Sequence, residues 1–346
     1  MNDNNIKQAV LHASFCAGII GIAGLFIWFG MGYFIPSVLI VAAIVLALNI
    51  LMRALGRLAA QKFSVKKWAG LACSIFLIVL TVIVSVSGIV YSAQDGMIFY
   101  SVKNPESREF LKGRPNCTEI EFTAGNGKTY HGMMYKRTDE KAPLIIYFGG
   151  NGEVSYQHFR LREEQNRWIY FSDCNFLFVD FEGYGLNSGK ASYLNMYEES
   201  LAIFDYAASL SAVDSNRIIS MGYSIGTGGA VYLAANRPVT GLILAAPYAN
   251  GYDFYNNMLP IFKGPMKLLV KQKFPSDQYA VNVTCPVFVI ASHSDETIPF
   301  SSTQRLVKLF AGKVDFIELD NTNHNSLFKE TRANLLLQSF IEGVIK

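Results

Sequence analysis

The sequence is short of charge. Only 16% of its 346 residues are Asp, Glu, Lys or Arg, whereas 51% are hydrophobic, and soluble globular domains carry about 25% charged residues. This balance excludes a disordered chain and argues against a protein that is soluble throughout. The formal net charge is only +3, so the composition gives no sign of a nucleic-acid binder.

Motifs for metal, redox and phosphate chemistry are also missing. The five cysteines include no CxxC pair, so neither a zinc site nor a redox dithiol is indicated. Cys117, Cys174 and Cys285 permit at most one disulfide among themselves, and we expect buried free thiols. The Gly226-Thr-Gly-Gly stretch lacks the lysine of a phosphate-binding loop. We therefore expect no metal, no cofactor and no nucleic-acid partner.

Charge is scarcest in residues 1–97, which carry six basic and two acidic residues. A single helix over the 45 uncharged residues between Lys7 and Arg53 would be roughly 68 Å long, more than twice a bilayer's hydrocarbon core. Two spans with a turn at Gly30–Pro36 fit better. A third uncharged run covers Trp68–Gln94. We predict a transmembrane anchor over 1–97, with spans near 9–30, 34–52 and 68–90, and a linker over 98–117.

The loop 53–67 between the second and third spans carries five basic residues and no acid. Positively charged loops stay on the cytoplasmic side of a membrane. This rule places the loop and the N-terminus in the cytoplasm, and the chain after the third span on the extracytoplasmic side. The whole positive surplus thus belongs to the anchor, and the rest of the chain is slightly acidic.

From residue 118 onward, short apolar runs alternate with longer amphipathic stretches. The first two runs flank the turn 124–128 and indicate a hairpin; the later, nearly continuous runs are typical of strands buried on both faces of a parallel sheet. For 118–346 the pattern predicts an α/β fold with a mostly parallel sheet and helices on both faces. The expected strands are 118–122, 129–135, 144–148, 176–181, 217–221, 241–245, 286–291 and 314–319, and the expected helices 154–170, 194–210, 225–236, 301–310 and 327–344.

A GxSxG motif, Gly222-Tyr-Ser224-Ile-Gly226, lies between an expected strand and an expected helix. This is the context in which such a motif forms a nucleophile elbow. The sharp turn strains the serine backbone, so Gly222 and Gly226 must lack side chains. Ser224 is therefore the candidate nucleophile, and the alternative is a glycine-rich turn with an incidental serine.

A serine nucleophile needs a base within hydrogen-bond reach and an acid that orients the base. In this kind of fold the chain order is serine, acid, histidine. Asp295 follows an apolar strand, where the sites of open α/β sheets lie, and Asp320 is the alternative acid. His293 precedes Asp295, which is the wrong order, so His324 in the polar loop after the last strand is the candidate base.

Acyl chemistry also needs N–H donors for a developing oxyanion. The residue after the nucleophile supplies one donor, and the turn after the third strand supplies the other. These are Ile225 and, within Gly149-Gly-Asn-Gly-Glu153, Asn151. The alternative for the second segment is a plain glycine turn.

Together these motifs resemble the α/β-hydrolase superfamily over 118–344, and within it the Bem46-like and serine-aminopeptidase-like branch, which includes membrane-anchored lipases and protein depalmitoylases. The resemblance implies the α/β-hydrolase fold, a Ser224–Asp295–His324 triad, and Asn151 and Ile225 as the oxyanion donors. The matching landmarks are Tyr-Phe-Gly-Gly-Asn-Gly (147–152), Val-Asp-Phe-Glu-Gly-Tyr-Gly-Leu-Asn-Ser-Gly (179–189), Gly-Tyr-Ser-Ile-Gly (222–226), Asp-Glu-Thr-Ile-Pro (295–299) and Asn-His (323–324).

Two positions depart from this family pattern. Gly149 stands where the family usually has His, and Glu182 stands where it usually has Arg before Gly-Tyr-Gly. Neither position carries a proton transfer. The departures therefore put substrate preference and loop support in doubt more than hydrolysis.

The segment 247–284 is longer than a usual connection, and we expect it to form a lid. It is rich in aromatic and aliphatic residues, and Lys263, Lys267 and Lys271 recur at a spacing that would place them on one helical face. Either a core-covering helix exposes this basic face to solvent, or the face lies on anionic lipid headgroups beside an acyl pocket.

These features predict a multi-pass membrane serine hydrolase that cleaves the ester or thioester bond of a lipid-like or acylated substrate. A membrane-bound serine peptidase on the same triad is the second hypothesis, although no residue that would bind a free amino terminus is identifiable. A non-catalytic binding module would lack a triad member, and none is missing. The sequence predicts neither the acyl chain length, the leaving group, the membrane nor the oligomeric state.

Overall fold

The computed structural model describes residues 87–346 except 89, 104, 139, 165–172, 259 and 261. The chain divides into two compact units, Met1–Gln94 and Asp95–Lys346. Spans 9–30 and 34–52, and nearly all of span 68–90, lie outside the described residues. None of the helices within the described residues is both long enough and apolar enough to cross a bilayer.

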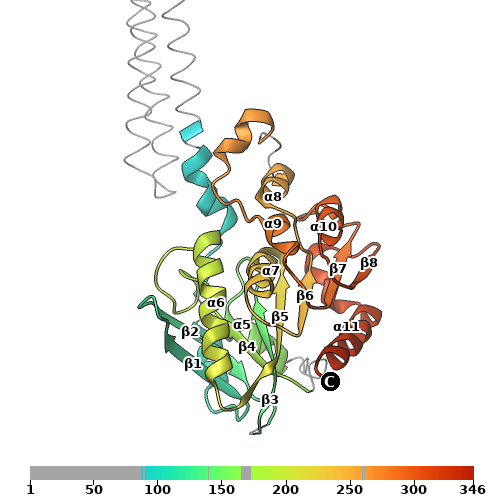
Figure 1. The fold of residues 1–346 in the computed structure, drawn as a ribbon. Coiled ribbons are helices and arrows are strands. Elements are labelled where there is room, and N and C mark those ends of the chain that lie inside the picture. Colours follow the sequence, from blue (N-terminus) through green and yellow to red (C-terminus); the bar gives the residue numbers. More distant parts are fainter. Residues whose placement is uncertain are drawn as a thin grey trace, which may run out of the picture. The chain divides into compact units, whose positions relative to one another are not determined.

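An eight-stranded sheet in the order β1-β2-β4-β3-β5-β6-β7-β8 forms the centre of the second unit (Figure 1). β2 pairs antiparallel with β1 and with β4, and all the remaining strand pairs are parallel. The mostly parallel α/β sheet expected from the sequence is thereby confirmed. The strands are β1 (Cys117–Thr123), β2 (Thr129–Tyr135), β3 (Ala142–Phe148), β4 (Asn175–Val179), β5 (Val213–Tyr223), β6 (Gly241–Ala245), β7 (Val287–Ser292) and β8 (Val314–Leu319).

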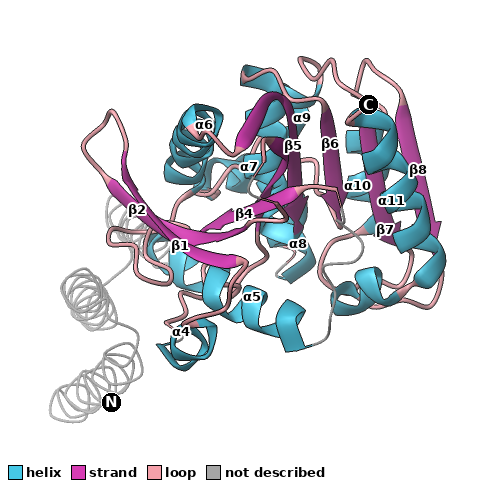
Figure 2. Cartoon of the chain, turned by 90° about the horizontal axis from the view of Figure 1, so that it is seen from below, coloured by secondary structure: helices cyan, strands magenta, loops and turns pink. Residues whose placement is uncertain are grey.

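Helices cover both faces of the sheet (Figure 2). The ring of Tyr147 in β3 contacts the helix α5 side chain His158, whereas the next residue, Phe148, lies against Gly229 of α7. Successive strand residues point to opposite faces, so α5 and α7 lie on opposite sides. The described helices are α4 (Pro105–Leu111), α5 (Ser155–Glu164), α6 (Tyr193–Ser209), α7 (Thr227–Asn236), α8 (Gly251–Met258), α9 (Ser276–Ala280), α10 (Phe300–Val307), α11 (Thr331–Val344) and the short 3₁₀ helices η2 (Ser224–Gly226), η3 (Gly264–Leu269) and η4 (His324–Lys329).

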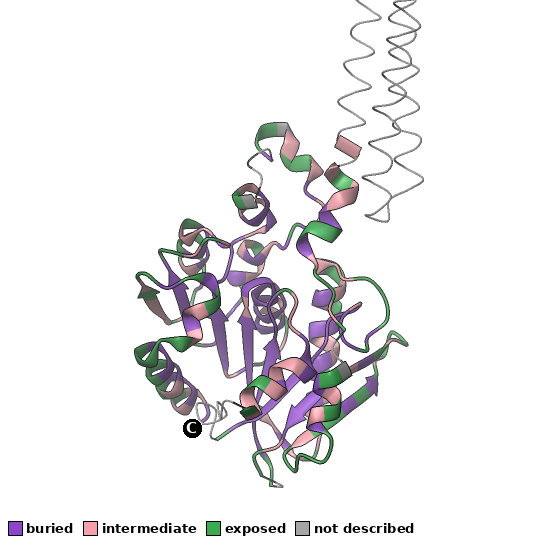
Figure 3. Cartoon of the chain, turned by 180° about the vertical axis from the view of Figure 1, so that it is seen from behind, coloured by how far each residue is buried: buried purple, intermediate pink, exposed green. Residues whose placement is uncertain are grey.

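The central strands form the core of this unit. Every residue of β3, β4, β6 and β7 is buried, as the purple strands of Figure 3 show. β1 instead alternates buried and exposed side chains over its second half. The nearly continuous apolar runs therefore mark strands covered on both faces, and the alternating run marks the edge hairpin.

The expected basic helical face of Lys263, Lys267 and Lys271 is wrong. η3 covers only Gly264–Leu269, so Lys263 precedes it with an extended backbone and Lys271 follows it. Gly264 has a φ of +53°, a left-handed conformation that breaks a helix between the first two lysines. The expected helix 327–344 is likewise divided, into η4 and α11.

Asp180, directly after β4, is a fully buried carboxyl group. Its Oδ1 accepts a hydrogen bond from the Ser155 backbone N–H at the start of α5, at 2.5 Å, and its Oδ2 has no hydrogen-bond partner. Burial raises the pKa of Asp180 to about 7. This residue therefore couples the stability of the fold to pH.

We expect Asp180→Asn to flatten the pH dependence of stability between about pH 4 and pH 7. The folded protein keeps a proton on Asp180 that the unfolded chain releases near pH 3.9. This group's contribution is therefore fully present below pH 4 and is lost as pH rises, by at most about 1.4 kcal/mol per unit. Urea unfolding of wild type, Asp180→Asn and the exposed control Asp320→Asn at pH 4.5 to 7.5 measures it. Equal slopes in all three would contradict it.

Candidate active site

The serine of the GxSxG motif lies at a strained turn between β5 and α7. Ser224 has a φ of +52°, in the left-handed region that residues other than glycine rarely adopt. A Cβ atom on Gly226 would lie 2.1 Å from the Phe148 carbonyl oxygen, and one on Gly222 would lie 2.7 Å from the Thr227 Cα. Both positions thus require glycine, and the serine sits in the geometry of a nucleophile elbow.

The structure brings the predicted serine, histidine and aspartate into one hydrogen-bonded chain. His324 Nε2 lies 2.9 Å from Ser224 Oγ, and His324 Nδ1 lies 2.7 Å from Asp295 Oδ2. The His324 and Asp295 side chains are only 7% and 2% exposed. An imidazole that donates through Nδ1 to a carboxylate can accept the serine proton on Nε2.

Asp295 is fixed by the loop that carries it. Its Oδ1 accepts hydrogen bonds from the Thr297 and Ile298 backbone N–H groups, both at 2.8 Å, which leaves Oδ2 for His324. The alternatives lie elsewhere. His293 pairs with Glu318 at 3.2 Å, and Asp320 is exposed.

The elbow tyrosine holds the histidine loop. Tyr223 donates its hydroxyl to the His324 carbonyl oxygen and is also 3.1 Å from Asn325 Oδ1. Its ring stacks on the His324 ring with centroids 5.3 Å apart. The residue before the nucleophile thus positions the base.

The turn after β3 lies directly against the elbow. Besides the Phe148 contact, a Cβ on Gly226 would lie 2.4 Å from the Gly149 carbonyl oxygen, and one on Gly150 would lie 2.7 Å from the Tyr223 ring. Asn151 is anchored through its side chain, whose Oδ1 accepts from the Tyr100 N–H at 2.7 Å and from the Tyr184 hydroxyl at 2.9 Å. Ile225 lies in the first turn of η2, where N–H groups lack helical partners.

Glu153 supports this turn, and the sequence analysis missed it. Its Oε2 accepts hydrogen bonds from the Gly150 N–H and the Tyr147 hydroxyl, both at 2.8 Å, and its Oε1 lies 3.8 Å from His158 Nδ1. Burial opposes ionisation, but these three partners lower the pKa of Glu153 to about 2. The sequence signal for this role was an acidic residue at the end of a glycine-rich turn. Its side-chain partners come from β3 and α5.

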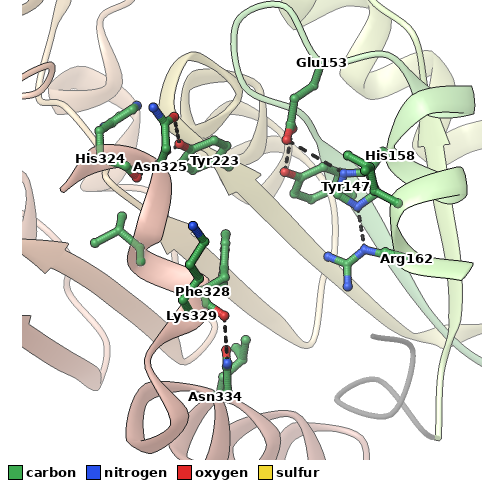
Figure 4. Close-up of a pocket in the computed structure, with 13 residues that line it drawn as sticks. Tyr147, Glu153, His158, Arg162, Tyr223, His324, Asn325, Phe328, Lys329 and Asn334 are labelled. Atoms are coloured by element: carbon green, nitrogen blue, oxygen red, sulfur yellow. Dashed lines mark hydrogen bonds and ion pairs between the residues drawn. The ribbon is translucent and has the colours of Figure 1, made fainter. Parts of the chain in front are cut away.

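Arg162 completes a part-buried polar chain behind the turn (Figure 4). Arg162 Nε donates to His158 Nε2 at 2.6 Å, so a neutral His158 carries its proton on Nδ1, which faces Glu153. Burial and the Arg162 charge lower the pKa of His158. The chain Arg162–His158–Glu153 therefore ends on the backbone N–H of Gly150.

A cavity of about 270 Å³ lies between this polar chain and the histidine loop. Figure 4 shows Tyr223 and Asn325 on one side of it and Tyr147, His158 and Arg162 on the other. Its lining includes His324 and four apolar side chains: Leu161, Leu327, Phe328 and Leu337. Apolar groups of a substrate could be buried there, next to the candidate base.

The described cysteines do not form a second reactive site. Within the described ranges, no cluster of three His, Cys, Asp or Glu side chains could hold a metal ion. Cys117, Cys174 and Cys285 are free thiols. Burial raises the pKa to about 12 for Cys117 and Cys174 and to about 11 for Cys285, which makes them poor nucleophiles.

Sequence relatives include proteins named for the same domain. A Mycobacterium tuberculosis protein named as uncharacterized is 26% identical over 261 residues, which cover 73% of this chain and 89% of that protein. The Caenorhabditis elegans alpha/beta hydrolase domain-containing protein aho-3 is 31% identical over 170 residues, 49% of each chain. The human alpha/beta hydrolase domain-containing protein 17C is 30% identical over 155 residues, 45% of each chain. No protein-family model matches the chain.

Solved structures show the same fold. The Pyrococcus furiosus esterase Pf2001 superposes with a TM-score of 0.57 at 15% identity, covering 72% of this chain and 100% of that one. The acetyl xylan esterase from Paenibacillus sp. R4 superposes with a TM-score of 0.53 at 15% identity, covering 73% and 99%. With the sheet order and the elbow, these matches show that the chain has the α/β-hydrolase fold.

We expect Glu153→Ala to slow the reaction of Ser224 with a fluorophosphonate about tenfold to hundredfold. Without the carboxylate, the Gly150 N–H loses its partner and the turn shifts relative to the elbow, and loss of a single oxyanion donor costs about 10² to 10³ in rate. Glu153→Gln keeps one acceptor oxygen and should lose less. Labelling kinetics measure both, with the exposed Glu164→Ala as control. A wild-type rate in Glu153→Ala would refute this role.

Proposed function

We propose that this protein is a membrane-anchored serine hydrolase that cleaves acyl ester or thioester bonds. The observation that carries the proposal is the hydrogen-bonded chain from Ser224 through His324 to Asp295, with the serine in a strained elbow. The names of the relatives and the esterase titles of structures with the same fold support it.

Acylation would begin when His324 takes the Ser224 proton as the oxygen attacks the substrate carbonyl carbon. Asp295, buried and bonded to Nδ1, stabilises the imidazolium that forms. The negative charge that develops on the carbonyl oxygen would be bound by the backbone N–H groups of Ile225 and Asn151. His324 then protonates the leaving alcohol or thiol, and the acyl group remains on Ser224.

Deacylation repeats these steps with water. His324 removes a proton from water, the resulting hydroxyl attacks the acyl carbon, and Ser224 regains its proton as the acid is released. The four apolar side chains in the otherwise polar lining of the cavity beside His324 favour a substrate with an apolar portion, such as an acyl chain. Glu153, the acidic side chain of the lining, already accepts hydrogen bonds from Tyr147 and Gly150 and faces His158, which weighs against its binding a free amino terminus.

The anchor and its topology belong to the proposal. The three uncharged runs of residues 1–97 would hold the enzyme in a bilayer, with the loop 53–67 in the cytoplasm and the hydrolase unit on the extracytoplasmic side. A site held at a membrane meets acylated and lipid-like substrates at high local concentration.

We expect a fluorophosphonate probe to label wild type and the exposed-serine control Ser301→Ala, and not to label Ser224→Ala. Asp295→Asn should lower kcat about 10⁴-fold, because His324 would then hold the wrong tautomer. Gel-based labelling and hydrolysis of a p-nitrophenyl acyl ester measure the two effects. Equal labelling of wild type and Ser224→Ala would exclude the mechanism.

The leaving-group class can be tested with matched substrates. We expect kcat/KM for p-nitrophenyl esters and for thioesters of the same acyl chain to exceed that for aminoacyl amides by more than about 100-fold. A length series of acyl esters would then locate the preferred chain. Faster cleavage of aminoacyl amides would instead favour the serine peptidase.

A further inference from the structure

The segment between α8 and α9 has charge of one sign. From residue 254 to residue 276 the sequence contains four lysines and no acidic residue. Lys263, Lys267 and Lys273 are exposed, and Lys271 is half-buried. The basic helical face is absent, but the structure still gathers the cations around one short helix, η3.

An apolar side chain lies at the tip of this basic segment. Leu268 in η3 is 86% exposed, the largest value among the exposed large hydrophobic side chains of the described part. Lys267 precedes it, with its ammonium 5.5 Å from the centre of the Tyr252 ring. Figures 1 and 3 show η3 standing away from the sheet with an exposed surface. An exposed leucine side chain is unfavourable in water. At a lipid headgroup interface the leucine can enter the apolar layer while the lysines meet the phosphates.

Two residues that follow η3, Lys271 and Gln272, are hydrogen-bonded to the residue that follows the third uncharged run. Asp95 comes directly after the uncharged residues 68–94 and is only 6% exposed. It accepts hydrogen bonds from Lys271 Nζ and, at 2.7 Å, from Gln272 Nε2. The residues after η3 are therefore bonded to the first residue of the second unit, which follows the third predicted span in the sequence.

The same segment is tied to the candidate active site. Gly251 at the start of α8 donates its N–H to the Lys273 carbonyl oxygen at 2.6 Å. At the other end of α8, Asn257 Nδ2 donates to the carbonyl oxygens of Glu296 and Thr297, both at 2.8 Å. These two residues follow Asp295 in its loop, so the position of α8 is linked to the acid of the triad.

We propose that residues 263–273 form a docking surface for an anionic lipid bilayer. Leu268 enters the interface while Lys263, Lys267 and Lys273 bind lipid phosphates. The absence of any acid over 254–276 complements a negatively charged surface, and Asp95, which is bonded to the segment, follows the third predicted span in the sequence. This inference rests on the membrane anchoring in the proposed function, and it adds the lipid class and the contact.

The test uses the full chain in lipid nanodiscs. The other cysteines are replaced, and an environment-sensitive NBD fluorophore is attached through Leu268→Cys, or through Leu194→Cys as a control on α6, where the native leucine is 57% exposed. In discs of phosphatidylcholine with phosphatidylglycerol, emission at position 268 should rise at least twofold and shift to the blue. The control label should not respond.

Charge dependence separates this surface from a plain apolar contact. The rise at position 268 should be lost in pure phosphatidylcholine, in high salt, and in the triple variant Lys263→Gln, Lys267→Gln, Lys273→Gln. An identical signal in neutral and anionic discs, or one unchanged by the triple variant, would overturn the proposal. The proposal would also be overturned if the label at position 268 responded only when a soluble protein was added and not to lipid.

Fluorophosphonate labelling of Ser224 is measured on the same discs. A silent label at position 268 with normal Ser224 labelling would refute the docking surface and leave the hydrolase proposal intact. A responsive label without Ser224 labelling would refute the hydrolase proposal alone. Circular dichroism of each variant checks that it is folded.

Discussion

The close approach of the nucleophile turn to the end of β3 is the constraint on which the site depends. Gly226 lies so near the Phe148 and Gly149 carbonyl oxygens that any side chain would collide with them. This contact joins two loops that are about 75 residues apart in the sequence. It sets the serine beside the turn that is expected to bind the oxyanion, and α7 begins directly behind it.

Two polar chains converge on that contact, one of them buried and the other partly exposed. One runs from Asp295 through His324 to the serine oxygen. The other runs from Arg162 through His158 and Glu153 to the Gly150 backbone. In both, a carboxylate accepts hydrogen bonds; those of Asp295 lie inside the protein, where such bonds are stronger than in water and where leaving one unmade is costly. The first chain moves a proton in the proposed mechanism, whereas the second holds backbone in place.

Much of this architecture could be predicted because it depends on local pattern. β2, β6 and β8 have the expected bounds, since apolar runs between turns mark buried strands. The residues of the serine–histidine–aspartate chain were predicted from chain order and strand ends, and the structure places them in contact, although their catalytic role remains a proposal. Glu153 was missed because its partners come from other elements, and the lid helix was wrong because Gly264 adopts a left-handed backbone.

The contacts of Asp95 determine where the second compact unit can be separated from the residues that precede it. Lys190, Lys271 and Gln272 all meet the carboxylate of Asp95, whose pKa these hydrogen bonds lower against the effect of burial. A protein that began after this residue would leave the side chains of Lys271 and Gln272 without that partner. The second unit with all of these contacts therefore begins at or before Asp95, two residues before the predicted anchor ends.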